Sequence, residues 1–296
     1  MRYFAYTIDP LHIGTGGYRL GRVDNTIIRD PGTNLPKIPG TSISGVCRNY
    51  AIYNLEGEER EKALECAKRD EKNDKNNCGE CIICKIFGFA SGKQKKNQVG
   101  RVKFFDGQII AFPVATMVGP VWVTTASILN ELGIDVPAPP SDVLFGAREL
   151  AQDSDRINLG WLYMKLDTSE AEKIKLPEEV LNTKIGKKIS ERLIIAPEWL
   201  FAEIVNSNLE VRTSVSIDFE TGAADPGALF TYEAIPRATL FSFDVVIDEY
   251  RCNSDEGITK QKVEVVVKSG LKLFEPLGLG GMNTRGFGRI KVLNLD

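Results

Sequence analysis

Histidine is nearly absent from this chain of 296 residues, since it occurs only once, at position 12. Zinc sites with two or more histidine ligands are therefore excluded, and enzymes that need several catalytic histidines are disfavoured. No apolar run approaches the ~18 residues that a membrane-spanning helix requires. The opening residues also lack the basic and apolar regions of a secretory signal. These absences predict a cytoplasmic protein with no membrane partner.

An excess of basic residues is also missing. Lys and Arg total 37 against 40 Asp and Glu, which gives a formal charge of -3. Nucleic-acid-binding proteins usually carry a basic excess, so any RNA or DNA site here must be a local patch. Hydrophobic residues at 43% and charged residues at 26% are ordinary for a globular protein. At roughly 150 residues per domain, the length predicts about two domains or one elaborated domain.

Short runs of β-branched and aromatic residues predict strands, and apolar residues at helical spacing predict helices. The expected strands are residues 3–9, 26–29, 104–113, 121–123, 240–247 and 289–295. The expected helices start after Pro39-Gly40, near Ser127 and at Thr259, with Thr41 or Ser42 as the N-cap of the first. Residues 143–210 are poorly periodic, with candidate helices at 170–175 and 191–204.

The order of these elements indicates an α+β fold. Strand–helix–strand patterns at both ends flank a variable middle, which predicts one antiparallel sheet with helices on one face, as in ferredoxin-like folds. Residues 211–219 and 228–235 alternate β-branched and polar side chains around a turn-rich segment. This pattern predicts a hairpin that projects from the sheet.

Two glycine- and serine-rich segments are candidates for phosphate binding. Residues 278–288 contain five glycines, whose backbone N–H groups can hold phosphate oxygens, and Arg285 adds positive charge. Residues 40–45 offer hydroxyls and N–H groups at the positive end of a helix, with Arg48 one turn further on. The alternatives are a tight connection that needs glycine for its geometry, and ordinary helix capping.

The glycine-rich loop from His12 to Asp24 contains the single histidine and a carboxylate. Asp24 is a candidate ligand of a divalent cation or of a ribose hydroxyl, and His12 is a candidate proton carrier. The alternative is that Asp24 closes a turn and His12 packs in the core.

Six cysteines in a chain without an export signal indicate a reducing compartment, where a cluster more often binds metal than forms disulfides. Cys78, Cys81 and Cys84 form a CxxCxxC string, and Cys66 is the obvious fourth ligand of a tetrahedral structural zinc site. An iron–sulfur cluster is less favoured, because no Cys-Pro follows at cluster spacing. Free thiols without metal are the alternative, and Cys47 and Cys252 are expected to pack in the core.

Three motifs in this order resemble the RAMP superfamily of CRISPR proteins nearly end to end: KIPGTSISGVCR, CGECIICKIFG and GLGGMNTRGFGRIKV. Two further segments resemble in particular the repeating backbone subunits of type III-B (Cmr) RNA-targeting complexes: FPVATMVGPVWVTTASIL and RTSVSIDFETGAADPGALFTYEAIPR. The type III-A (Csm) backbone subunits share the glycine loops and the hairpin, but they fit the first of these two segments less well.

The resemblance implies a single RAMP domain with a modified ferredoxin-like (RRM-like) palm and a thumb hairpin. The palm would comprise about 1–55, 100–135 and 238–296, the insertion about 56–99, the variable middle about 136–210, and the thumb about 211–236. Copies of such a chain stack along a guide RNA with other subunits of the effector complex. The resemblance also implies that complementary target RNA is cut at regular intervals, with Mg²⁺ or Mn²⁺ as cofactor.

The resemblance assigns roles to particular residues. Asp24 would be the cleaving residue, with His12, Tyr232 and Glu233 as helpers. The contacts to the guide backbone would be Ser42, Ser44, Arg48, Gly280, Gly281, Asn283, Thr284 and Arg285. The expected chemistry is in-line attack of a 2′-hydroxyl on its own phosphate, which leaves a cyclic phosphate and spares DNA.

Two alternatives remain open at this point. One is a non-catalytic scaffold that only holds guide RNA. The other is a guide-processing endonuclease that acts alone on repeat RNA. Such enzymes usually rely on a histidine-based acid–base pair, which a single histidine fits poorly.

Overall fold

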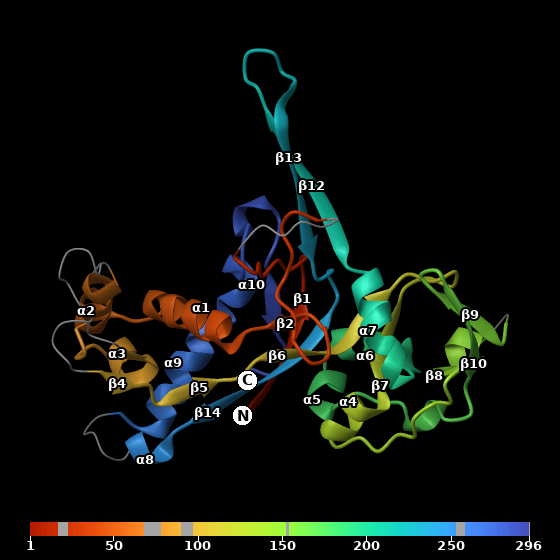
Figure 1. The fold of residues 1–296 in the computed structure, drawn as a ribbon. Helices are drawn as coiled ribbons and strands as arrows, with labels where there is room; N and C mark the ends of the chain where they lie inside the picture. Colours follow the sequence, from red (N-terminus) through yellow and green to blue (C-terminus); the bar gives the residue numbers. More distant parts are fainter. Residues whose placement is uncertain (17–22, 68–77, 90–96, 152–153, 253–257, 296) are drawn as a thin grey trace.

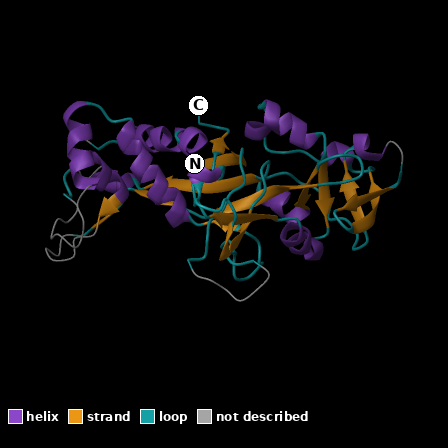
Figure 2. Ribbon diagram, turned by 90° about the horizontal axis from the view of Figure 1, so that it is seen from above, coloured by secondary structure: helices purple, strands orange, loops and turns teal. Residues whose placement is uncertain are grey.

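A long twisted sheet forms the centre of the molecule and carries a projecting hairpin (Figure 1). The computed structural model describes residues 1–16, 23–67, 78–89, 97–151, 154–252 and 258–295. The sheet has the strand order β15-β1-β14-β6-β7-β11-β8-β10-β9, and β2 and β5 pair with β6 and β14. Helices gather toward the two ends of this sheet when the molecule is seen from above (Figure 2).

The first half of the described chain contains these elements: β1 (Arg2–Thr7), β2 (Lys37–Ile38), α1 (Gly40–Tyr53), α2 (Gly57–Ala67), α3 (Ile82–Phe87), β3 (Gly88–Phe89), β4 (Gln98–Val99), β5 (Val102–Phe104), β6 (Gly107–Val114), β7 (Val121–Thr125), α4 (Ala126–Glu131) and β8 (Val143–Gly146). The second half contains these: β9 (Arg156–Leu159), β10 (Leu162–Asp167), α5 (Glu178–Leu181), α6 (Lys184–Ser190), β11 (Leu193–Ala196), α7 (Glu198–Ser207), β12 (Glu210–Ile217), β13 (Ala224–Ala234), β14 (Leu240–Ile247), α8 (Glu249–Cys252), α9 (Lys260–Lys272), α10 (Phe274–Leu277) and β15 (Ile290–Val292).

The strands from the two ends of the chain lie side by side. β1 pairs antiparallel with both β14 and β15, and β14 pairs antiparallel with β6. α1 and α9 pack together and bury the apolar face that the sequence pattern predicted for α9. A Cβ at Gly270 would lie 2.5 Å from the carbonyl oxygen of Cys47, so this close helix contact requires glycine.

The middle of the chain extends the same sheet, and here the sequence-based prediction was partly wrong. β11 runs parallel to β7, and β10 runs parallel to β8, so the sheet is mixed instead of antiparallel. β11 also lies where a helix over 191–204 was expected. All four of its residues are buried, and a short run of buried apolar residues is compatible with either element. The helix α7 begins only after Pro197, and residues 171–173 form one 3-10 turn.

Two other predictions need correction. Residues 26–29 make isolated bridges instead of a strand, because they pair with separate partners such as Gly14 and Pro36. The strand expected at 104–113 is split between β5 and β6, since Phe105 hydrogen bonds to β14 and Asp106 turns toward α1. In the insertion expected at about 56–99, residues Gly57–Ala67 form α2, and residues 68–77 and 90–96 lie outside the described chain.

The hairpin β12–β13 stands clear of the sheet (Figure 1). The register pairs Glu210 with Ala234 at its base and Val215 with Leu229 further out. A two-stranded hairpin is marginally stable alone, so its base depends on neighbouring segments. In the part of the chain that the structure describes, no helix has the length and apolarity needed to cross a membrane.

Candidate active site at the base of the hairpin

Asp24 lies at the base of the hairpin and is hydrogen-bonded to Thr231 of β13. Its Oδ2 accepts from the Thr231 backbone N–H at 2.8 Å and from the Thr231 hydroxyl at 2.7 Å. The Asp24 backbone N–H donates to the same hydroxyl oxygen at 2.9 Å. Hydrogen bonds from Thr231 lower the pKa of Asp24, which is a partly exposed, ionised carboxylate at neutral pH. An ionised carboxylate beside a projecting hairpin is able to bind a cation or accept a proton.

The segment that follows Asp24 runs along β13 and is fastened to it through Glu233. The two Glu233 carboxylate oxygens accept from the backbone N–H of Ile27 at 3.1 Å and from the Arg29 guanidinium at 2.6 Å. Glu233 is 9% exposed, so this is a largely buried ion pair. Both oxygens are therefore engaged, which suits a structural link better than the catalytic role expected from the sequence.

His12 follows β1 and is 8% exposed. Its Nδ1 lies 2.6 Å from the backbone oxygen of Glu233. Because a carbonyl oxygen can only accept, Nδ1 must carry the proton, and Nε2 is left to accept or donate one. The ring also meets the ring of Tyr232 edge-on, with centroids 5.8 Å apart. His12 and Asp24 thus both contact the stretch of β13 from Thr231 to Glu233, His12 through Tyr232 and Glu233 and Asp24 through Thr231.

The C-terminal glycine loop packs against the residues around His12. The N–H of Gly281 donates to the backbone oxygen of His12 at 2.8 Å, and the N–H of Gly288 donates to Pro10. The amide of Gly281 is therefore not available for a phosphate. This part of the loop forms a tight connection that needs glycine for its geometry, which was the alternative to phosphate binding. A Cβ at Gly280, whose φ is +89°, would lie 2.6 Å from the His12 oxygen, so the close approach requires glycine.

The outer part of that loop is open to solvent. Its exposed members include Gly280, Asn283, Thr284 and Arg285. The base of the hairpin is close by, since the Arg212 guanidinium lies over the ring of Phe287 at 4.6 Å. The loop, the hairpin base and the Asp24 carboxylate therefore occupy one region, and exposed positive charge lies within it.

The start of α1 differs from the prediction. Pro39 occupies the N-cap position with no side-chain cap, so neither Thr41 nor Ser42 caps the helix. The carboxylate of Asp106 accepts from the N–H of Gly40 at 2.8 Å and also pairs with Lys37. A protein carboxylate thus occupies part of the positive helix end that was expected to hold phosphate. Ser42 and Ser44 are half-buried on the first turns of the helix.

Arg48 contacts the cysteine cluster. It donates to the backbone oxygen of Gly88 at 2.5 Å and to the Sγ of Cys84 at 3.6 Å. The expected contact of Arg48 with guide RNA has no support in this geometry. α1 does approach the C-terminal loop near its other end, where the Tyr50 hydroxyl donates to the backbone oxygen of Gly278 at 2.8 Å.

Cys66, Cys78, Cys81 and Cys84 form a compact group whose sulfur atoms all lie within 4.8 Å of one another. The Sγ atoms of Cys66 and Cys84 are 3.4 Å apart. Hydrogen bonding from Cys81, together with the charge of Arg48, lowers the pKa of Cys84 to about 5. Burial raises the pKa of Cys66 to about 11. Four sulfur donors at this spacing suit a tetrahedral soft-metal site, and all four are the residues expected from the sequence.

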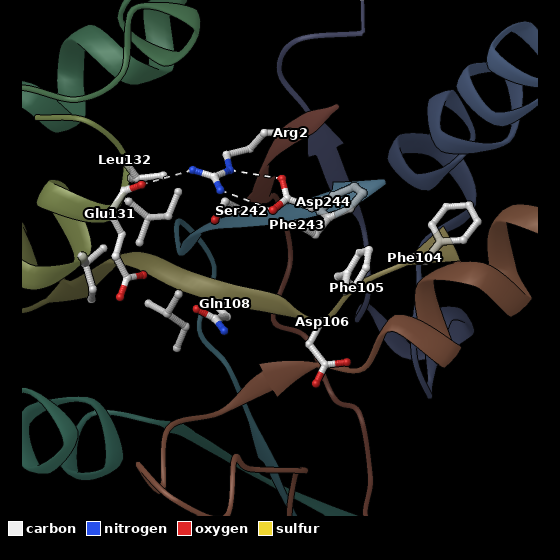
Figure 3. Close-up of a pocket in the computed structure, with 13 residues that line it drawn as sticks. Arg2, Phe104, Phe105, Asp106, Gln108, Glu131, Leu132, Ser242, Phe243 and Asp244 are labelled. Atoms are coloured by element: carbon white, nitrogen blue, oxygen red, sulfur yellow. Dashed lines mark hydrogen bonds and ion pairs between the residues drawn. The ribbon is translucent and has the colours of Figure 1, made fainter. Parts of the chain in front are cut away.

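Two residues of the Asp24 region were missed from the sequence. Arg29 lies in no motif. Thr231 lies inside the quoted hairpin segment but was given no role, although it is two residues before Glu233 and therefore on the same face of β13. By contrast, a hollow lined by Arg2, Gln108, Glu131 and Asp244 contains none of the expected site residues (Figure 3). Its polar groups include the Arg2–Asp244 ion pair.

Comparison with known proteins gives relatives that match nearly the whole chain. The "CRISPR system Cmr endoribonuclease Cmr4" of Pyrococcus furiosus is 29% identical over 302 residues, which cover 97% of this chain and 92% of the relative. The "CRISPR system Cms endoribonuclease Csm3" of Methanothermobacter thermautotrophicus is 25% identical and covers 96% of this chain and 79% of the relative.

Solved structures share the fold. The crystal structure of oligomeric Cmr4 from Pyrococcus furiosus has a TM-score of 0.59 at 21% identity and covers 99% of this chain and 98% of its own. A chain of the type III-B Cmr-beta complex bound to cognate target RNA has a TM-score of 0.66 at 17% identity, covering 99% of this chain and 96% of its own. The sequence profile of the RAMP superfamily matches residues 4–291. This chain belongs to the RAMP superfamily.

Proposed function

We propose that this chain is a backbone subunit of a type III-B CRISPR effector complex that binds guide RNA along a filament and cleaves complementary target RNA at regular intervals. The observation that carries this proposal is the match along 97% of the chain to a relative named as a Cmr endoribonuclease. The partners are guide RNA, target RNA, other copies of the chain and other subunits of the complex. We also propose a cytoplasmic location, because four of the six cysteines form a group suited to metal binding, which is typical of a reducing compartment.

Within the α+β fold, we assign a ferredoxin-like palm. It consists of the strands β1, β6, β14 and β15 and the helices α1 and α9. Their antiparallel order β15-β1-β14-β6 supports it, because each helix connects two strands that are not neighbours. The hairpin β12–β13 is then the thumb, and the chain is one RAMP domain with an insertion after α1.

The proposed reaction is attack of a target 2′-hydroxyl on the adjacent phosphate, which forms a cyclic phosphate and releases the 5′-hydroxyl of the next nucleotide. Asp24 accepts the proton of the attacking hydroxyl or holds a divalent cation through Oδ1, because Oδ2 is hydrogen-bonded to Thr231. Oxygen donors suit Mg²⁺ or Mn²⁺, which would supply charge neutralisation at the phosphate. His12 transfers a proton between its Nε2 and the reacting oxygens of the RNA, and the ring of Tyr232 packs against the His12 ring. For Glu233 we propose a positioning role.

The guide RNA is proposed to follow the exposed outer part of the C-terminal loop. Arg285 supplies charge, and Gly280, Asn283 and Thr284 supply polar groups without reading bases. This suits a protein that must accept any guide sequence. Ser42 and Ser44 remain proposed contacts, while the amide of Gly281 and the guanidinium of Arg48 are already occupied.

For the group formed by Cys66, Cys78, Cys81 and Cys84 we propose structural Zn²⁺. The mutual distances of the four sulfur atoms support it, since zinc binds cysteine sulfur in tetrahedral groups of four. The ion would hold α2 and α3 together at the edge of the palm.

The test uses complexes assembled with guide RNA from wild-type chain and from an Asp24→Asn chain. We expect equal guide and target binding, but cleavage reduced at least about 100-fold in the variant. A target with a 2′-deoxy nucleotide at each scissile position should resist cleavage, and chelation of divalent cations should stop the wild-type reaction. Unchanged cleavage by the Asp24→Asn complex would leave the chain as a non-catalytic scaffold.

The 25% identical Csm3 relative favours one second candidate, a backbone subunit of a type III-A complex. The two candidates differ in their partner subunits. Identification of the subunits that copurify with the chain from its own cell separates them. Incubation of the isolated chain with repeat RNA tests for a guide-processing endonuclease, for which we expect no cleavage.

A further inference from the structure

We propose that Thr231 is a positioning residue for target RNA cleavage, which fixes one oxygen of the Asp24 carboxylate and couples that carboxylate to the thumb hairpin. This inference rests on the proposed function and adds a residue to it. Thr231 lies on β13 and contacts Asp24 across 207 positions of sequence. It lies within the segment RTSVSIDFETGAADPGALFTYEAIPR, but the family resemblance assigns it no role.

The contact is reciprocal. The Thr231 hydroxyl has one hydrogen to donate and two lone pairs. It donates to Oδ2 of Asp24 at 2.7 Å and accepts from the Asp24 N–H at 2.9 Å, while its own backbone N–H donates to Oδ2 at 2.8 Å. The backbone donor and the hydroxyl donor of Thr231 both end on the same oxygen, so the carboxylate cannot rotate without breaking these hydrogen bonds. Oδ1 is then the oxygen left for a hydroxyl or a cation.

Two other aspartates in the described chain make a similar-looking contact with a threonine. Asp30 accepts from the N–H and hydroxyl of Thr33, and Asp218 accepts from those of Thr221. Both of these pairs are three residues apart and close local turns. The Asp24–Thr231 pair closes no turn. It joins the loop after β1 to the hairpin, which a turn-closing role does not explain.

The neighbouring contacts extend this link. Asn25 donates its N–H to the Thr231 backbone oxygen at 3.0 Å, and the Glu233 N–H donates to the Asn25 oxygen at 2.9 Å. The buried Arg29–Glu233 ion pair completes the attachment. The segment with the carboxylate therefore moves with the lower part of β13. When the hairpin engages a guide–target duplex, its position sets the position of Asp24 relative to the scissile phosphate.

The test compares assembled complexes that carry Thr231→Val with complexes that carry Thr231→Ser. Valine keeps the branched shape and the backbone donor but removes the hydroxyl, whereas serine keeps the hydroxyl. At saturating target RNA we expect Thr231→Val to cleave roughly 10- to 100-fold more slowly, because a misplaced catalytic group costs this much. Target affinity should stay unchanged, and Thr231→Ser should cleave within about 3-fold of wild type.

Thr33→Val is the matched control, because it removes a hydroxyl-to-aspartate hydrogen bond in a turn outside the proposed site. We expect it to cleave like wild type. Wild-type cleavage by Thr231→Val, or equal slowing in the valine and serine variants, would overturn the proposal. If the valine variant does not assemble, Thr231→Ala against Thr231→Ser gives the same comparison. If Asp24→Asn abolishes cleavage while Thr231→Val does not, the positioning role is wrong and the proposed function stands.

Discussion

At the residue scale, the Arg29–Glu233 pair governs how firmly the Asp24 segment is held. The Arg29 side chain is 22% exposed and that of Glu233 12%, so neither charge is well solvated. Removal of one partner from a buried pair leaves the other without compensation. We expect Arg29→Met to lower the free energy of unfolding by about 3 kcal/mol. Urea denaturation of the purified chain measures this loss.

The control for that measurement is Lys62→Met. The Lys62–Glu58 pair lies on α2 with side chains 67% and 87% exposed, and solvent weakens such a pair. Its loss should cost less than about 0.5 kcal/mol. Equal costs for the two substitutions would show that the Arg29–Glu233 pair does not hold the segment.

Asp24 and His12 became candidates through the family resemblance, because the glycine-rich loop by itself is equally compatible with a turn-closing aspartate and a histidine packed in the core. The sequence could not identify Thr231 or Arg29. Their importance comes from contacts across 207 and 204 positions, and no local spacing records such a contact. The same limit explains Arg48, whose charge was assigned to RNA although its partner, Cys84, lies 36 positions away.

At the element scale, the cysteine group is expected to decide whether α2 and α3 stay attached to the palm. A structural zinc site contributes its binding energy to folding. We expect Cys78→Ser to reduce bound zinc from about one ion per chain to near none, with a lower melting temperature. Elemental analysis and thermal unfolding of the purified chain measure both. Cys252→Ser is the control, because Cys252 is buried outside the group and should leave the zinc content unchanged.

Arg48 provides a second prediction at this scale. Its contacts to Cys84 and Gly88 are both within the cysteine region, so Arg48→Ala should weaken that region instead of the guide site. We expect easier loss of zinc to a chelator, and guide RNA affinity within about 2-fold of wild type, because no phosphate contact is lost. A large loss of guide affinity with normal zinc retention would restore the role that the sequence suggested.

Elements with a clear hydrophobic periodicity in the sequence were predictable, whereas elements defined by pairing between distant segments were not. α9 and the hairpin follow their patterns, since each has a face that the sequence marks. β11 pairs with β7 about 70 positions earlier, and only that pairing decides that its four buried residues form a strand. The cysteine group was predictable because Cys78, Cys81 and Cys84 follow one another at intervals of three residues.

At the scale of the whole molecule, the charge of -3 requires RNA binding to be local. Positive charge is offered by Arg285 in the C-terminal loop, close to the hairpin base, where the guanidinium of Arg212 is paired with Glu210. The binding free energy for guide RNA should therefore come from a few phosphate contacts that release counterions. The acidic remainder of the surface then disfavours binding of nucleic acid elsewhere.

If guide binding depends on a few phosphate contacts, Arg285→Ala should remove one of them. Each phosphate contact to a single strand contributes about 0.7 to the slope of log affinity against log salt concentration, so the slope should fall by about 0.7 in magnitude. Guides of different sequence should be affected equally, because a phosphate contact does not read bases. Arg156→Ala is the control: this exposed arginine lies on β9 at the far edge of the sheet and should leave the slope unchanged. An equal change of slope in both variants would mean that guide RNA follows the general surface of the chain and that the outer part of the C-terminal loop is not its path.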